Sequence, residues 1–126
     1  MIERGRGGRI VNVGSISGQI VNRDVAGRQY ETSKAAVIHF TRAVAADWPH
    51  FGINFNVICP GLFMTDANRE WEQTDRRAID SFVAGVPMER AGEPEEIVPL
   101  AVYLASPASS YVTGASFVID GGYTVW

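Results

Sequence analysis

The sequence is poor in basic residues, has a single cysteine and lacks long apolar runs, and each shortage excludes a class of protein. Eleven basic residues stand against 14 acidic ones, so there is no basic stripe to neutralise nucleic-acid phosphates. Cys59 is alone and cannot form an internal disulfide. No apolar run reaches the ~18 residues that a membrane span needs. We therefore expect a cytoplasmic chain with neither a nucleic-acid nor a membrane partner.

Three short apolar runs, bounded by glycine, proline or serine, predict β-strands at residues 9–15, 53–60 and 115–122. Residues 16–28 lack a clear period and predict a loop. Since helical patterns separate the strands, we expect an α/β fold with three parallel strands and crossover helices.

Three segments predict helices between these strands. Residues 28–48 carry apolar side chains around most of the helix circumference, which predicts a helix buried on more than one side. Residues 67–84 are amphipathic, and Thr65 or Asp66 could cap a helix there. Residues 93–107 begin with proline and three glutamates, as helices often do.

Lys34 is the only lysine, and it follows Tyr30 by four residues in the stretch YETSK. Residues four apart share a helix face. An adjacent ammonium and a helix N-terminus both favour the phenolate, so we expect a lowered pKa and a tyrosine able to act as a general acid/base. A compact, rotatable ammonium can also hydrogen-bond a diol while it lies near a phenol, a combination for which a wide planar guanidinium is unsuited. A Tyr-x-x-x-Lys pair also occurs by chance on many helices, so the pair alone does not exclude an ordinary solvent-exposed helix face.

Other polar residues follow the carboxyl ends of the predicted strands. Ser15 ends the first strand, and the CPGLFMT stretch with Pro60, Gly61 and Thr65 ends the second. Ligands of parallel sheets bind at this edge. We therefore expect Ser15 and Tyr30 to lie close together at this edge, where the Ser15 hydroxyl could form a hydrogen bond with a substrate oxygen.

Five segments, in the same order, resemble the short-chain dehydrogenase/reductase family. They are GRIVNVGSISG, YETSKAAV, NFNVICPGLFMT, RAGEPEEIVPLAVYLASPASSYVTG and FVIDGGY. The resemblance implies that the chain is the C-terminal half of a doubly wound Rossmann-like domain, the catalytic and substrate part, over residues 1–126.

The resemblance also implies an activity, which is reversible hydride transfer between NAD or NADP and a secondary alcohol or its ketone. Tyr30 would be the acid/base, Ser15 would hold the reacting oxygen, and Lys34 would assist Tyr30 and bind the nicotinamide ribose. Pro60, Gly61, Phe63 and Thr65 would line the nicotinamide. SISGQIVN is similar to sugar-alcohol and ketose oxidoreductases, and the family implies a homo-oligomer.

Several motifs of the family are missing from the sequence. We find no glycine-rich turn between a strand and a helix, and GRGGRIV precedes a strand instead of following one. The N-terminal dinucleotide-binding half is therefore expected to be absent, and with it the sites for pyrophosphate and adenine. The interval from Ser15 to Tyr30 is also slightly longer than is usual in the family.

Two alternatives remain open at this point. The chain could be a non-catalytic fragment that acts only in association with a complete homologue, or a sugar-nucleotide epimerase or dehydratase, which also uses a Tyr-x-x-x-Lys pair. His39 and His50 are isolated, so no metal site is expected. Ser17 is interpreted as a turn residue, and Trp71 as a packing or substrate contact.

Overall fold

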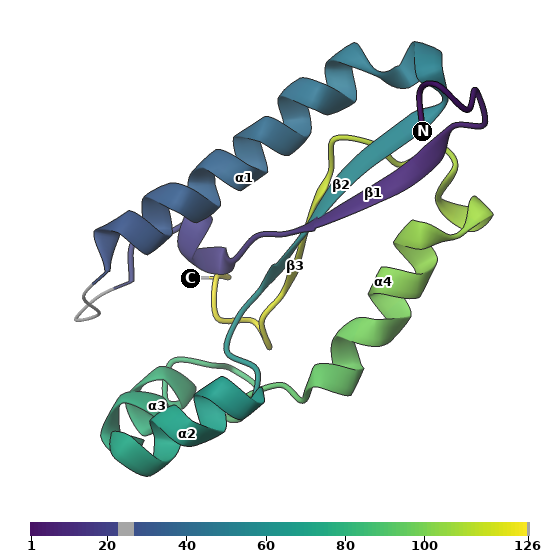
Figure 1. Ribbon diagram of the computed structural model, residues 1–126. Helices are drawn as coiled ribbons and strands as arrows, with labels where there is room; N and C mark the ends of the chain where they lie inside the picture. The colour runs from purple at the N-terminus through teal and green to yellow at the C-terminus, as the bar shows by residue number, and fades with distance from the viewer. Residues whose placement is uncertain (23–26, 126) are drawn as a thin grey trace.

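A computed structural model describes residues 1–22 and 27–125. Its three strands, β1 (Gly8–Val13), β2 (Ile53–Pro60) and β3 (Ser116–Ile119), form one parallel sheet in the order β1-β2-β3 (Figure 1). Val13 pairs with Ile58 and Pro60 with Ile119, so the three carboxyl ends lie at one edge. The predicted parallel α/β architecture is confirmed.

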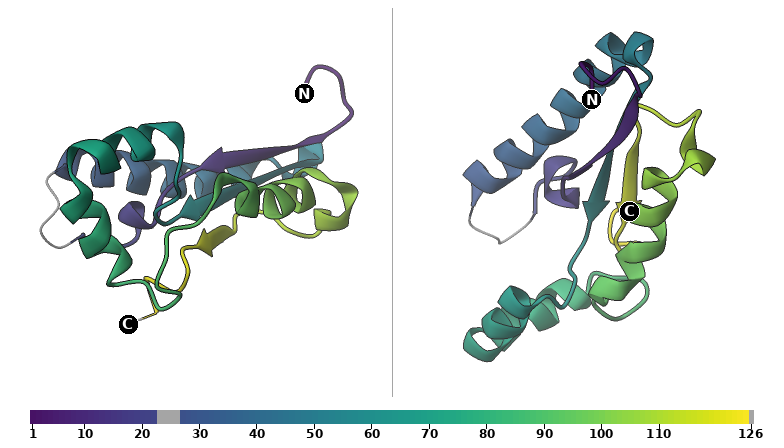
Figure 2. Two further views of the ribbon diagram at one scale, coloured as in Figure 1. Left: turned by 90° about the horizontal axis from the view of Figure 1, so that it is seen from below. Right: turned by 45° about the vertical axis from the view of Figure 1, so that its right-hand side comes forward.

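Helices cover both faces of the sheet. α1 (Arg28–Asp47) lies on one face and α4 (Val98–Ala105) on the other (Figure 2). The pair α2 (Asp66–Thr74) and α3 (Arg76–Val83) lies beyond the carboxyl ends of the strands, where a ligand site is expected (Figure 1). Short 3-10 helices join these elements: η1 (Ile16–Gly18), η2 (Pro49–Phe51), η3 (Pro94–Ile97) and η4 (Pro107–Ser109).

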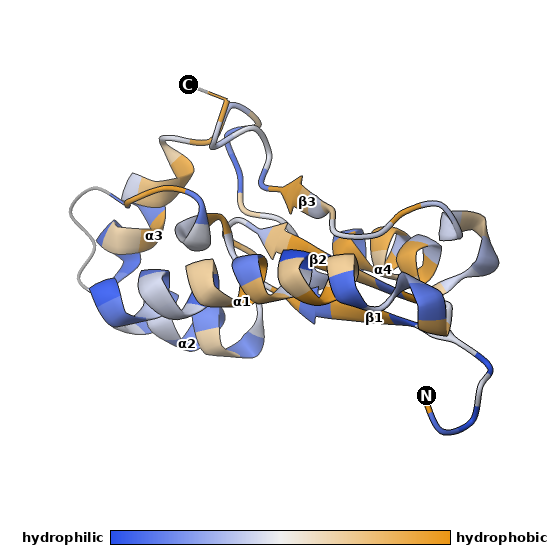
Figure 3. Ribbon diagram, turned by 90° about the horizontal axis from the view of Figure 1, so that it is seen from above, coloured by the Kyte–Doolittle hydropathy of each residue, from blue (hydrophilic) through white to orange (hydrophobic). Residues whose placement is uncertain are grey.

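The hydrophobic core lies between α1 and β2, the central strand. Phe55 of β2 is buried and makes edge-to-face contacts with Trp48 at 5.4 Å and Phe40 at 6.5 Å between ring centroids. Nearer the carboxyl end, Ile38 packs against Val57 and Cys59. Figure 3 shows that the strands and α4 are the most hydrophobic elements, as burial on both faces of a parallel sheet requires.

The prediction that the first helix is buried on more than one side is wrong for this chain. Only Ile38, Thr41 and Ala45 of α1 are buried, and Phe40 is 57% exposed. The described residues supply a sheet on one side of α1 and no layer on the other. Its outer apolar side chains therefore remain at the surface.

Several predicted boundaries differ from the structure. β3 ends at Ile119, three residues before the predicted end at residue 122. β1 ends at Val13, so Ser15 lies after the strand. The amphipathic segment is two helices, because the Asp75 side chain accepts a hydrogen bond from the Ala78 N–H and caps a new one. The last helix begins as η3, which places Pro99 in the first turn of α4.

The predicted loop at residues 16–28 is only partly described. Residues 16–18 are η1 rather than loop, and residues 23–26 lie outside the described part. Within residues 1–22 and 27–125, no helix is both long and apolar enough to cross a membrane.

Candidate active site

Ser15 lies where β1 passes into η1, and its hydroxyl is held by the local backbone. The side chain is buried, and its Oγ accepts a hydrogen bond from the Ser17 N–H at 3.1 Å as the N-cap of η1. A hydroxyl that accepts one bond retains its own proton for donation. The arrangement leaves Ser15 able to donate a hydrogen bond to a substrate oxygen.

Tyr30 and Lys34 lie on the first two turns of α1, as the spacing predicts. The Lys34 Nζ is 5.6 Å from the centroid of the Tyr30 ring and donates a hydrogen bond of 3.0 Å to the carbonyl of Val13. This bond ties the helix to the end of β1. An ammonium carries three protons, so Lys34 can still serve other acceptors next to Tyr30.

A close contact between η1 and α1 brings Ser15 toward Tyr30. Gly18 lies directly against the helix backbone: a Cβ on it would lie 2.6 Å from the Lys34 carbonyl carbon and 2.7 Å from the Ala35 nitrogen. Only glycine permits this approach. The position of Ser15 relative to α1 therefore depends on the missing side chain at Gly18.

One cavity of about 370 Å³ contains Ser15 and Tyr30 in its lining. Gly61, from the loop after β2, also lines it, so three of the predicted site residues meet there. The helices beyond the sheet edge contribute Asn68, Trp71 and Phe82. The volume and mixed polarity are those of a small-molecule site.

The other predicted residues of the β2 loop lie outside the lining of this cavity. Phe63 is buried and lines an adjacent cavity of about 250 Å³, which shares Leu62 with the first. Thr65 caps α2, its Oγ1 accepting a hydrogen bond from the Asn68 N–H at 3.4 Å. Pro60 is the last residue of β2. The nicotinamide role of these residues stays a prediction.

Sequence reasoning did not identify Asn22, Glu31, Asn68 and Phe82 as site residues, although all four line the cavity. Glu31 follows Tyr30 directly, and that adjacency was the available signal. The other three come from separate segments that no local spacing relates. Among the described residues, no cluster of three His, Cys, Asp or Glu side chains could hold a metal ion.

Glu96, in the lining of the smaller cavity, is an acidic group perturbed by a paired arginine. The two terminal nitrogens of the Arg90 guanidinium, Nη1 and Nη2, each donate to its carboxylate at 2.7 Å, and the Glu93 N–H donates at 2.8 Å. The Arg90 hydrogen bonds are the main reason that the pKa of Glu96 falls to about 2.

This pair yields a pH prediction. We expect the carboxyl carbon of Glu96 to titrate near pH 2 in an NMR titration. In Arg90→Met its pKa should rise toward the ordinary value of about 4.3 but stay below it, because the Glu93 N–H still donates to the carboxylate. A lowered pKa means that the pair stabilises the fold above about pH 4.3 and loses this contribution as the pH falls toward 2. Arg77→Met serves as the control that leaves Glu96 unchanged, and an ordinary midpoint in the unaltered protein would contradict the assignment.

The fold and site together define a class. A parallel sheet with helices on both faces, and a cavity beyond the carboxyl ends of its strands that Ser15 and Tyr30 line, is a Rossmann-like α/β arrangement. Residues 1–124 match the family profile described as Enoyl-(Acyl carrier protein) reductase, and the chain belongs to the short-chain dehydrogenase/reductase family.

Several known proteins are similar to this chain. The chain is 46% identical to galactitol 2-dehydrogenase (L-tagatose-forming) of Cereibacter sphaeroides, over 100% of this chain and 49% of that protein. It is 39% identical to D-arabinitol 2-dehydrogenase (ribulose-forming) of Scheffersomyces stipitis, over 100% of this chain and 46% of that protein. A gluconate 5-dehydrogenase from Burkholderia cenocepacia, solved with NADP and tartrate, superposes with a TM-score of 0.87 at 34% identity, covering 99% of this chain and 48% of that one. The chain thus spans about half the length of the relatives it matches.

Proposed function

We propose that the chain is the catalytic and substrate-binding part of an NAD(P)-dependent oxidoreductase that interconverts a secondary alcohol of a polyol or sugar and its ketone. The observation that carries the proposal is that Ser15 and Tyr30 line one cavity, with the Lys34 ammonium 5.6 Å from the tyrosine ring. The sugar-alcohol dehydrogenases among the relatives support the substrate class.

In the oxidative direction, the substrate hydroxyl lies between Ser15 and Tyr30. The Ser15 hydroxyl donates to the substrate oxygen, while its own oxygen stays anchored on the Ser17 N–H. Tyr30, as phenolate, takes the hydroxyl proton, and the positive charge of Lys34 stabilises that phenolate. In the reductive direction Tyr30 returns the proton to the carbonyl oxygen.

The residues present fit a nicotinamide ribose beside Tyr30. The Lys34 ammonium donates one of its three N–H groups to the Val13 carbonyl, and the other two remain free to donate to ribose hydroxyls. Gly61, Pro60, Phe63 and Thr65 would line the ring from the β2 loop. A bound nicotinamide would accept or donate the hydride at the substrate carbon.

Residues 1–126 would then be the C-terminal part of the domain, and a preceding dinucleotide-binding half would hold the pyrophosphate and adenine. The exposed apolar side of α1, including Phe40, would pack against a second copy in a homo-oligomeric cytoplasmic enzyme. Besides NAD or NADP, its small-molecule partner would be the alcohol or ketone substrate.

The test uses a joined enzyme, in which the part of the Cereibacter sphaeroides galactitol 2-dehydrogenase that precedes its matched stretch is placed before Met1 of this chain. We expect it to oxidise galactitol with NAD or NADP, followed by NADH or NADPH absorbance. Failure to oxidise any polyol or simple secondary alcohol, by a joined enzyme with a cooperative thermal transition, would refute the proposed function.

The 126-residue chain by itself gives a second prediction. Without a glycine-rich turn to hold the pyrophosphate, we expect NADH to bind at least 100-fold more weakly than to the joined enzyme, since several charge-assisted hydrogen bonds are lost. Fluorescence titration of both proteins with NADH measures the ratio. Equal affinity would show that the described residues bind the dinucleotide unaided.

A further inference from the structure

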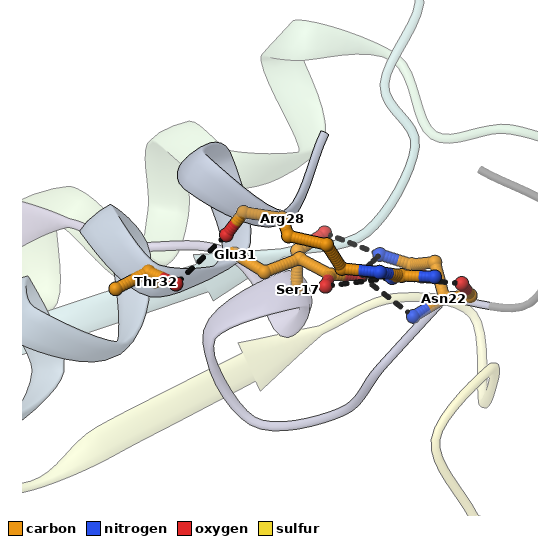
Figure 4. A network of polar contacts seen from close by, with 5 residues as sticks. All are labelled: Ser17, Asn22, Arg28, Glu31 and Thr32. Carbon is orange, nitrogen blue, oxygen red and sulfur yellow. Dashed lines mark hydrogen bonds and ion pairs between the residues drawn. The ribbon is translucent and has the colours of Figure 1, made fainter. Parts of the chain in front are cut away.

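Hydrogen bonds hold the polar side of the candidate active-site cavity (Figure 4). Glu31 Oε1 accepts hydrogen bonds at 2.9 Å from the Asn22 N–H and from the Arg28 guanidinium. The Asn22 Nδ2 in turn donates to Ser17 Oγ at 2.8 Å. Ser17, Asn22 and Glu31 all line the cavity, so this side is fixed by hydrogen bonds among its own residues.

The apolar side of the cavity is built differently. Leu62, Trp71 and Phe82 contribute to it, the last two from α2 and α3. These helices lie beyond the edge of the sheet (Figure 1), and of residues 66–83, all of which the structure describes, only Ile79 is buried. The hydrophobic core between α1 and the sheet therefore does not fix the position of Phe82, and another contact must do so.

That contact is an aromatic stack with Tyr123, in the turn after β3. The rings of Phe82 and Tyr123 are parallel within 5°, with 4.3 Å between their centroids. The approach is close, since a Cβ on Gly85 would lie 3.0 Å from Tyr123 Cε2. Stacked aromatic rings attract each other beyond the effect of burying their area. Tyr123 is not among the residues that line the cavity, so it contacts the wall from behind.

The turn that carries Tyr123 is itself held by hydrogen bonds. Asp120 Oδ1 accepts from the Gly122 N–H at 2.9 Å, and Oδ2 accepts from the Thr124 N–H at 2.9 Å and from its hydroxyl at 2.8 Å. Both carboxylate oxygens of Asp120 thus close the turn around Tyr123. The Tyr123 ring is a fixed support for the end of α3.

We propose that Tyr123 is a positioning residue that holds the Phe82 ring as the apolar wall against which the carbon chain of the substrate binds. This inference rests on the proposed function, in which Ser15 and Tyr30 hold the reacting hydroxyl. Tyr123 does not touch the substrate. It determines how strongly the cavity binds each methylene group, because a wall that is free to move away covers less apolar surface.

The test compares two alcohols that differ by two methylene groups, 2-hexanol and 2-butanol, in the joined enzyme. We expect the unaltered enzyme to have a lower KM for 2-hexanol, by about fourfold for each methylene that the wall covers. Tyr123→Leu keeps an apolar side chain but has no ring to stack, and it should lose most of this advantage. Its kcat should not change, since the wall binds the ground state and the transition state alike.

Tyr123→Phe should restore the full advantage, because it keeps the ring and lacks only the hydroxyl. Phe82→Leu should lose the advantage as Tyr123→Leu does, and the double variant should lose no more than either one, since the two rings act as a unit. Tyr103→Leu is the matched control, because Tyr103 is an exposed tyrosine of α4 that does not line this cavity.

A binding measurement on the 126-residue chain does not require turnover or a variant. Selective irradiation of the Phe82 ring protons in a saturation-transfer NMR experiment should saturate the terminal methyl of 2-hexanol more than the methyl next to its carbinol carbon. A chain that shows this pattern, in a joined enzyme that oxidises neither alcohol, would refute the proposed function and leave this inference standing.

Three outcomes would overturn the inference. The first is an unchanged advantage of 2-hexanol in a Tyr123→Leu enzyme, and the second is an equal fall in kcat for both alcohols in that variant, which would indicate general distortion. The third is a 2-hexanol molecule that receives no saturation from Phe82, which decides the matter even if Tyr123→Leu loses its cooperative thermal transition.

Discussion

We expect Tyr30→Phe to lower kcat of the joined enzyme by about 10²–10⁴-fold, the range that a positioned general acid/base contributes. The substitution removes one hydroxyl and keeps the ring that Lys34 approaches at 5.6 Å. Because the Tyr30 side chain is half exposed, its removal should leave the thermal unfolding temperature nearly unchanged. Steady-state kinetics with galactitol and a thermal scan measure the two effects.

Tyr111→Phe is the matched control, since Tyr111 is fully exposed and lines a cavity on other elements. It should retain full activity. A Tyr30→Phe enzyme with undiminished kcat would refute the acid/base role of Tyr30. An enzyme that loses activity together with its cooperative unfolding would point to a structural role instead.

The second large effect is expected from Gly18→Ala. Its new methyl group would lie 2.6 and 2.7 Å from backbone atoms of Lys34 and Ala35, and 2.8 Å from Ile38 Cδ1. No side-chain rotation relieves contacts with a helix backbone, so η1 must move away from α1. Ser15 begins η1 as its N-cap, so it should move away from Tyr30. We expect a stability loss of about 1–3 kcal/mol, typical of overpacking, and a fall in kcat of at least tenfold, because small misplacements of reacting groups are costly.

Gly5→Ala separates these two effects. Gly5 has a left-handed backbone, with φ of 60°, which Gly18 does not share, and nothing lies within 4 Å of a Cβ placed on it. It should cost about 1–2 kcal/mol of stability through backbone strain and leave kcat intact. Urea unfolding and steady-state kinetics on both variants measure the difference. Normal kcat in Gly18→Ala would show that the close packing of η1 does not position Ser15.

Local sequence patterns were sufficient to predict most of the helices and strands. The apolar run of β2 and the long periodic stretch of α1 were predicted almost to the residue, because glycine and proline mark their ends. The segment at 67–84 was not predicted to divide, since its helical period continues across Asp75. The division depends on one capping hydrogen bond, to the Ala78 N–H.

The candidate site likewise contains residues that the sequence predicted and residues that it did not. Spacing alone placed Tyr30 beside Lys34, because residues four apart share a helix face whatever surrounds the helix. It did not identify Asn22 or Glu31, which meet across nine positions of the chain. Their meeting depends on the path of the chain between η1 and α1.

The sequence by itself determined a parallel α/β fold, and it predicted that Ser15, Tyr30 and Gly61 gather at the carboxyl edge of the sheet, where they line one cavity. These follow from short-range periodicity and from the common direction of parallel strands. Only the tertiary structure decided that Gly18 lets η1 lie against the backbone of α1, and that the Glu31 carboxylate accepts hydrogen bonds from Asn22. Both are contacts between separate elements, and their geometry depends on how the elements pack rather than on any local pattern.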